Sequence, residues 1–82
     1  MNGCLMEVRP GDHYRLELIF RNGSTAVVNM EKRIHSIRFS KLKSPQLFRT
    51  ARADGDQIVW SDGKEKISVY ASEILDSMMI NY

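Results

Sequence analysis

The chain has 82 residues and a formal net charge of +2, with 43% hydrophobic and 27% charged residues. These proportions are those of an ordinary globular protein and exclude an intrinsically disordered chain; five glycines and two prolines exclude a collagen-like or linker-like one. A chain of this length has room for one small core, so we expect residues 1–82 to form a single domain.

The single cysteine and the short apolar runs indicate the cellular compartment. Cys4 has no partner for an internal disulfide bond and cannot build a thiolate zinc site, which fits a reducing environment. No apolar run approaches the roughly 20 residues that a membrane span requires. Residues 1–9 lack the basic start and the apolar stretch of a signal peptide. We therefore predict a cytoplasmic protein with no membrane partner.

The first half of the chain predicts three antiparallel strands. Residues 5–9 form a short strand that ends at the turn-forming sequence Pro10-Gly11-Asp12. Residues 14–20 begin as an alternation of apolar and polar side chains, which places every second residue on one face. Asn22-Gly23 follows and favours a type I′ turn, after which residues 25–29 form the return strand.

The middle of the chain predicts helical structure. Residues 30–34 form one short helical turn. Ser44 can cap a helix whose first residue is Pro45, since proline at that position loses no hydrogen bond. The neighbouring apolar side chains would pack on a sheet, and they are Leu42, Leu47 and Phe48.

The second half returns to strands and ends in a helix. Residues 49–53 and 57–60 read as strands, and residues 66–70 as a strand or the approach to a helix. Ser72 can cap a C-terminal helix with one apolar stripe, formed by Ile74, Leu75, Met78 and Met79. The predicted fold class is α+β, with one antiparallel sheet of five to six strands, short helical segments and a C-terminal helix.

Four short motifs, in this order and spacing, resemble a known family. They are Phe20-x-Asn22-Gly23, Leu42-x-x-Pro45-x-Leu47-Phe48, Ile58-Val59-Trp60-x-Asp62-Gly63 and Ile74-Leu75. Together they resemble the short bacterial family catalogued as domain of unknown function 2442, and the likeness spans residues 5 to 76.

The resemblance implies a compact antiparallel α+β domain with no established catalytic residues. Some members of the family carry an additional helix-turn-helix domain. Others are encoded beside a second short protein, which has led to toxin–antitoxin proposals. The resemblance therefore implies an antitoxin-like protein that acts on the product of a neighbouring gene.

The charge distribution supplies the candidate binding residues. Residues 32–52 contain seven lysines and arginines and no acidic residue, although the whole chain holds ten acidic residues. Such a segment can bind an acidic protein or the phosphates of a nucleic acid, with Phe39 and Phe48 as stacking surfaces, or its charges can face several directions and balance the acidic residues elsewhere. We select as partner-binding residues Arg33, Arg38, Lys41, Lys43 and Trp60.

Other residue combinations are less specific. Asp12-His13 can act as a general base oriented by a carboxylate, or it can be an exposed turn pair, which we favour. Cys4 reads as a small apolar residue rather than a nucleophile. Asp54-Gly55-Asp56 reads as a turn rather than as part of a calcium loop, so we predict no metal and no cofactor. Trp60 either anchors the core or lines a ligand pocket.

These observations predict a non-enzymatic protein-interaction module that binds another protein through the basic segment 32–52. The alternative is a nucleic-acid-binding accessory or regulatory protein that uses the same residues. A ligand-binding protein with a pocket at Trp60 is a third possibility. Edge strands in so small a sheet also allow two copies of the chain to pair as a homodimer.

Overall fold

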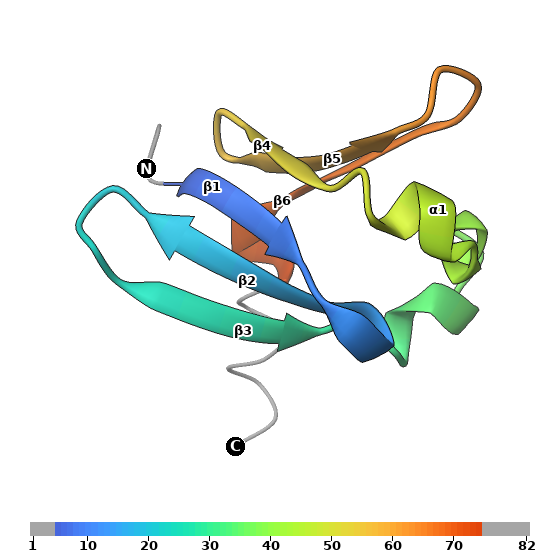
Figure 1. Cartoon of the computed structure of the whole chain (residues 1–82), viewed down its shortest axis with the longest axis horizontal. Coiled ribbons are helices and arrows are strands. Elements are labelled where there is room, and N and C mark those ends of the chain that lie inside the picture. The colour runs from blue at the N-terminus through green and yellow to red at the C-terminus, as the bar shows by residue number, and fades with distance from the viewer. Residues whose placement is uncertain (1–4, 75–82) are drawn as a thin grey trace.

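The computed structural model describes residues 5–74, which form two antiparallel sheets of three strands each (Figure 1). The first sheet has the order β1-β2-β3 and contains β1 (Leu5–Pro10), β2 (Arg15–Phe20) and β3 (Thr25–Asn29). The second has the order β4-β5-β6 and contains β4 (Arg52–Asp54), β5 (Gln57–Ser61) and β6 (Lys66–Tyr70).

The prediction of one sheet of five to six strands is wrong, because the strands divide into two sheets. Between β3 and β4 the chain passes through η2 (Arg33–His35), η3 (Ser40–Lys43) and α1 (Pro45–Phe48). This helical connection carries the second set of strands across the core instead of extending the first sheet. The strands β1 and β4 lie close together, yet the backbone pairing does not join them into one sheet (Figure 1).

One cluster of buried apolar side chains lies between the sheets and the helical connection. Leu16 and Leu18 come from the first sheet, Ile58 and Trp60 from the second, and all four are fully buried. Tyr14 and Phe20 are partly buried and pack against the same cluster, which confirms the face predicted from the alternation in residues 14–20. Alternation at period two therefore identifies the core face of the central strands.

The β2–β3 turn differs from the predicted type I′ turn. Gly23 has a φ of 88°, but among the residues described Asn22 is not in the left-handed region. Gly23 N–H donates to Phe20 O and Phe20 N–H donates to Ser24 O, at 3.0 and 2.9 Å. This is the pattern of a type I turn closed by a left-handed glycine. The Asn22 side-chain oxygen accepts hydrogen bonds from Ser24 N–H and from Ser24 Oγ–H, and these bonds stabilise this turn.

The helical connection follows the predicted start signal. The Ser44 hydroxyl accepts from Leu47 N–H at 3.4 Å, and Pro45 is the first residue of α1. Leu42, Leu47 and Phe48 are buried, as predicted. Strand β4 begins at Arg52 instead of Arg49, because Thr50 N–H and Ala51 N–H still bond to carbonyls of α1.

The structure of residues 66–74 tests two predictions, the strand at 66–70 and the helix cap at Ser72. Residues 66–70 are a strand, and residues 71–74 are already helical, so Ser72 lies inside this helix rather than at its cap. Ala71 N–H donates to Asp56 O at 2.9 Å, which fixes the transition from strand to helix. The predicted helix beyond Ile74, and Cys4, lie outside the described residues. Within residues 5–74 no helix has the length and apolar character needed to cross a lipid bilayer.

The β5–β6 turn is held by one carboxylate. Asp62 Oδ1 accepts from Lys64 N–H at 2.9 Å and from Glu65 N–H at 2.8 Å, and Gly63 takes a φ of 93°. The hydrogen bond from Glu65, followed by that from Lys64, lowers the pKa of Asp62 below its ordinary value. Both bonds favour the ionised carboxylate.

We predict that this turn loses stability in acid. Because the pKa of Asp62 is lower in the folded than in the unfolded protein, its contribution is present above the unfolded pKa of about 4 and disappears as pH falls through the folded value. Asp62→Asn keeps an acceptor oxygen but does not titrate. Urea unfolding at neutral pH and at about pH 3 measures the effect. A stability difference between wild type and Asp62→Asn that is equal at both pH values would contradict it.

We also predict that two apolar residues of the helical connection contribute very differently to the stability of the protein. Leu42 is fully buried, whereas Ile37 is 97% exposed. Leu42→Ala should lower the free energy of unfolding by about 2–4 kcal/mol, because it leaves a cavity in the core. Ile37→Ala should change it by less than about 0.5 kcal/mol. Urea titration followed by Trp60 fluorescence compares the two, and equal losses would show that this segment does not pack as described.

Candidate functional site

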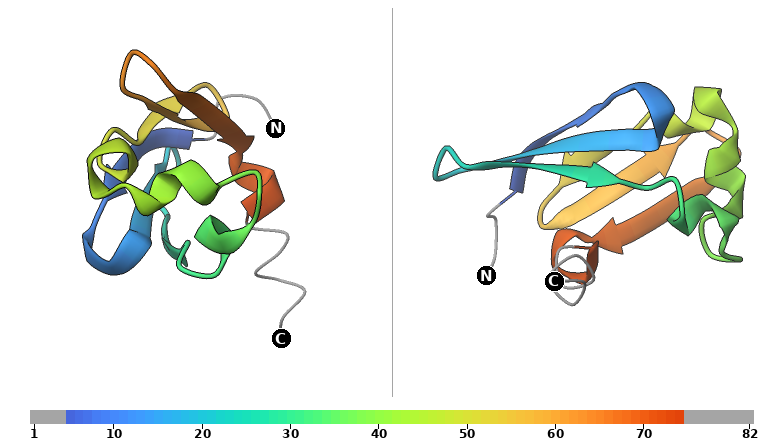
Figure 2. Two further views of the ribbon diagram at one scale, coloured as in Figure 1. Left: turned by 90° about the vertical axis from the view of Figure 1, so that its right-hand side faces the viewer. Right: turned by 90° about the horizontal axis from the view of Figure 1, so that it is seen from below.

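The basic segment lies mostly at one end of the molecule. The elements η2, η3 and α1 gather there beside η1 (Asp12–Tyr14), the turn between β1 and β2, and Figure 2 shows this end facing the viewer in its left-hand view. We call these four elements the helical end. Ile34, Leu42 and Phe48 anchor it to the core, so its charged side chains are left at the surface.

Two of the predicted binding residues already have carboxylate partners. Arg38 Nη1 lies 2.9 Å from Glu73 Oε2, and its Nη2 donates to Ser68 O at 3.1 Å. Lys41 Nζ donates to Glu65 Oε1 at 2.6 Å and also bonds the second oxygen of that carboxylate. The Arg38 and Lys41 side chains are 54% and 59% exposed, so each ion pair contributes at most about 1 kcal/mol. The pairs neutralise this part of the basic segment.

The other cations of the segment remain unpaired within the described part of the chain. Lys43 and Arg49, on either side of Ser44 and α1, are exposed and form no ion pair with any of residues 5–74. Lys32 and Arg52 are exposed and likewise unpaired there. Arg33 is half-buried, and its Nη2 lies 3.5 Å from Ile74 O. The unneutralised positive charge of the basic segment therefore comes chiefly from Lys43, Arg49 and their unpaired neighbours.

Trp60 belongs to the core and not to a surface. Its side chain is fully buried, with ring centroids 6.3 Å from Phe39 and 6.4 Å from Phe48. Its Nε1–H has no hydrogen-bond partner among residues 5–74. This burial corrects the selection of Trp60 as a partner-binding residue, because a partner cannot reach it in this conformation. Phe39 and Phe48 are also buried, so the segment has no row of exposed rings on which successive nucleic-acid bases could stack.

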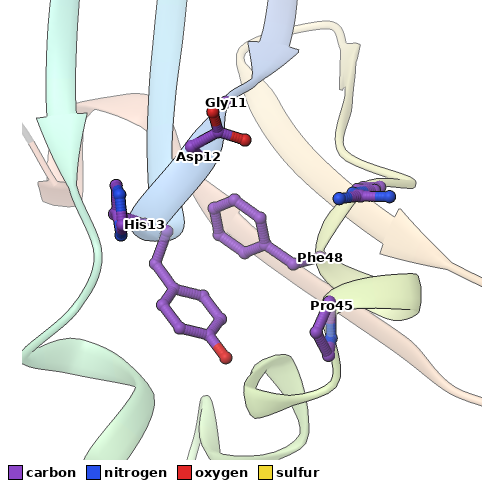
Figure 3. A pocket seen from close by; sticks show the side chains of 7 residues that line it. Gly11, Asp12, His13, Pro45 and Phe48 are labelled. Atoms are coloured by element: carbon purple, nitrogen blue, oxygen red, sulfur yellow. The ribbon is translucent and has the colours of Figure 1, made fainter.

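A shallow pocket of about 210 Å³ opens at the helical end, where the η1 turn meets α1 (Figure 3). It was not predicted from the sequence. The turn signal at Pro10-Gly11-Asp12 and the helix start at Ser44-Pro45 are both visible in the sequence, but nothing local indicates that they meet in space. The lining residues are Gly11, Asp12, His13, Tyr14, Pro45, Phe48 and Arg49.

The η1 turn that forms one wall has a strained backbone. His13 has φ 58° and ψ 36°, and Tyr14 follows with φ 60°, so two consecutive non-glycine residues are left-handed. Each such residue costs roughly 1–2 kcal/mol. The strain is offset by contacts of Tyr14, whose hydroxyl donates to Lys43 O at 2.6 Å and whose ring meets Phe48 edge-on at 5.3 Å. Met30 N–H also donates to Tyr14 O at 2.8 Å.

Asp12 and His13 do not form an oriented acid–base pair in the structure. Both are exposed, and no hydrogen bond joins their side chains. Figure 3 shows the two side chains on opposite sides of the η1 ribbon. The exposed turn pair that the sequence favoured is therefore the arrangement that the structure contains. Within residues 5–74 no three His, Cys, Asp or Glu side chains gather in one cluster.

We predict that glycine at residue 13 stabilises the protein. His13→Gly removes the cost of a left-handed conformation, which is about 1–2 kcal/mol. Glycine also gives the unfolded chain more conformational entropy, which lowers the free energy of unfolding by up to about 1 kcal/mol. The expected net change in the free energy of unfolding is therefore a gain of about 0–2 kcal/mol, with no loss. His35→Gly is the matched control, because His35 is exposed and not left-handed, and it should lose about 1 kcal/mol. Equal losses in both variants would show that the turn is not strained.

The comparisons with known proteins do not identify the chain. No protein-family model matches it, no curated protein matches it, and no solved structure matches it. The resemblance to the bacterial family 2442 therefore depends only on the four short motifs in the sequence.

Proposed function

We propose that the protein is a non-enzymatic interaction module of the bacterial cytoplasm that binds an acidic partner protein through its helical end. The observation that carries this proposal is the exposure of Lys43 and Arg49, unpaired among the described residues, beside the pocket. They belong to a stretch of sequence, residues 32–52, that contains no carboxylate. A cationic surface of this kind attracts an acidic partner and increases the rate of encounter.

The paired cations have a second role in this proposal. Arg38 and Lys41 connect the helical end to the two ends of β6, because Glu65 directly precedes that strand and Glu73 follows it. Because their charge is already balanced, they attract a partner less strongly than Lys43 and Arg49 do. Of the residues selected from the sequence, which were Arg33, Arg38, Lys41, Lys43 and Trp60, the proposal keeps Lys43 at the centre of the binding surface. It adds Arg49, which was not selected.

An acidic protein fits this surface better than a nucleic acid does. Single-stranded nucleic acids are held by cations together with aromatic rings that stack on the bases. The two aromatic residues within the basic segment, Phe39 and Phe48, are only 7% and 3% exposed. The resemblance to a family in which some members are encoded beside a second short protein also favours a small protein as the partner, in the manner of an antitoxin.

The partner can be identified directly. The tagged protein is recovered from a lysate of the organism that encodes it, with and without nuclease, and its companions are identified by mass spectrometry. A stoichiometric acidic protein that survives nuclease treatment supports the proposal. Recovery of nucleic acid alone, lost on nuclease treatment, would replace it with the nucleic-acid alternative, and a second copy of the chain would indicate a homodimer.

We predict that charge reversal beside the pocket slows association with the captured partner. Lys43→Glu and Arg49→Glu should each lower the association rate constant several-fold and weaken its dependence on salt. Arg21→Glu is the matched control, because Arg21 is exposed in the β2–β3 turn at the opposite end of the molecule (Figure 1). Surface plasmon resonance at two salt concentrations measures all three. Equal effects of the three variants would show that only net charge matters.

A further inference from the structure

The pocket between η1 and α1 indicates what the partner presents. We infer that it receives one aromatic side chain of the acidic partner, while a neighbouring carboxylate of that partner binds Arg49. The inference rests on the proposed function and adds the chemical identity of the contact. Four features of the pocket support it: its apolar floor, its charged rim, its fixed walls and its size.

The floor of the pocket is aromatic. Phe48 lines it although the residue is only 3% exposed, and Tyr14 lies edge-on to the Phe48 ring with centroids 5.3 Å apart at an interplanar angle of 81°. Pro45 adds a further apolar wall, and Figure 3 shows the Phe48 ring between Asp12 and Pro45. Because so little of Phe48 is exposed, an aromatic side chain from a partner would pack chiefly on Tyr14 and Pro45 and would reach only the exposed part of the Phe48 ring.

The rim of the pocket carries charges of both signs. Arg49 is exposed and forms no ion pair with residues 5–74, so its planar guanidinium is available to bind a carboxylate through two parallel hydrogen bonds. Asp12 is the acidic residue of the rim. It repels a second carboxylate and accepts a backbone N–H of the bound segment instead. The rim therefore favours one orientation of an acidic segment that contains an aromatic residue.

The walls of the pocket are held in place before any partner binds. One wall comes from the left-handed His13–Tyr14 turn and the other from α1, which are distant in the sequence. The bond from the Tyr14 hydroxyl to Lys43 O, at 2.6 Å, ties the turn to the end of η3 just before α1, and the Tyr14 ring contacts Phe48 of α1 itself. A site formed in advance loses less entropy on binding than one that must be assembled. Strained residues maintained at a pocket are also typical of functional surfaces.

The size of the pocket selects a side chain rather than a whole small molecule. At about 210 Å³ the pocket is smaller than the roughly 300–1,000 Å³ of typical small-molecule sites. A single aromatic ring fills a space of this order, and the remainder of the partner would lie across the neighbouring unpaired cations. We therefore commit to a segment of the acidic partner protein as the occupant.

Three synthetic peptides test the inference without the partner in hand. All are acetylated and amidated pentapeptides, with the sequences Asp-Glu-Phe-Glu-Asp, Asp-Glu-Ala-Glu-Asp and Asn-Gln-Phe-Gln-Asn. Each is titrated to millimolar concentration into the full-length ¹⁵N-labelled protein. The acidic phenylalanine peptide should shift the amide signals of residues 11–14 and 45–49. The other two should bind at least about fivefold more weakly, because each lacks one of the two required groups.

Two protein variants separate the pocket from general charge attraction. Arg49→Gln should weaken binding of the acidic phenylalanine peptide by about fivefold or more, because the carboxylate loses its charged donor. Arg52→Gln is the matched control, since Arg52 is a nearby exposed cation that does not line the pocket, and its effect should stay within about twofold.

Several results would overturn the inference. These are equal binding of the phenylalanine and alanine peptides, equal losses in Arg49→Gln and Arg52→Gln, amide shifts that avoid residues 11–14 and 45–49, or no binding by any peptide. The proposed function is tested separately by the captured partner and by Lys43→Glu. A partner that still responds to Lys43→Glu, together with a failed peptide titration, would leave the function in place and remove only the aromatic contact.

Discussion

The whole arrangement depends on the packing of the helical connection against Trp60. Each sheet has only three strands and buries little surface by itself, so a third layer must close the core. Phe39 and Phe48 supply that layer by packing on the indole ring, and Leu42 lies buried with them. The helical connection is basic and has little regular structure, so its few buried apolar residues determine how it folds. Its charges are fixed at the surface as a consequence of this packing.

The same packing links the core to the pocket. Phe48 contacts Trp60 on the core side and Tyr14 on the pocket side, so one ring belongs to both. The left-handed turn at His13 is tolerated because Tyr14 gains this contact and the hydrogen bond to Lys43 O. A change in the core at Trp60 would therefore alter the shape of a surface that Trp60 never reaches.

Local patterns in the sequence predicted the elements well and their arrangement less well. Alternation located β2, the Asn22-Gly23 turn signal located β3, and Ser44-Pro45 located the start of α1, because these signals depend on neighbouring residues. The division into two sheets depends on where the helical connection crosses the core, which no local pattern records. The basic segment was recognisable from composition. The neutralisation of Arg38 by Glu73 and of Lys41 by Glu65 could not be recognised in the same way, because each pair joins residues that are far apart in the chain.

The two ion pairs at the helical end have a consequence for the ions in solution. A lone surface cation holds mobile anions near it, and a bound partner releases them to the bulk. Arg38 and Lys41 already have Glu73 and Glu65 as fixed anions, so they hold few mobile ones to release. The entropy gained from ion release is therefore set by the unpaired cations. A count of all basic residues in the segment would therefore overstate the entropy gained on binding. In the folded chain, two of these cations have carboxylates of the same chain as their counterions.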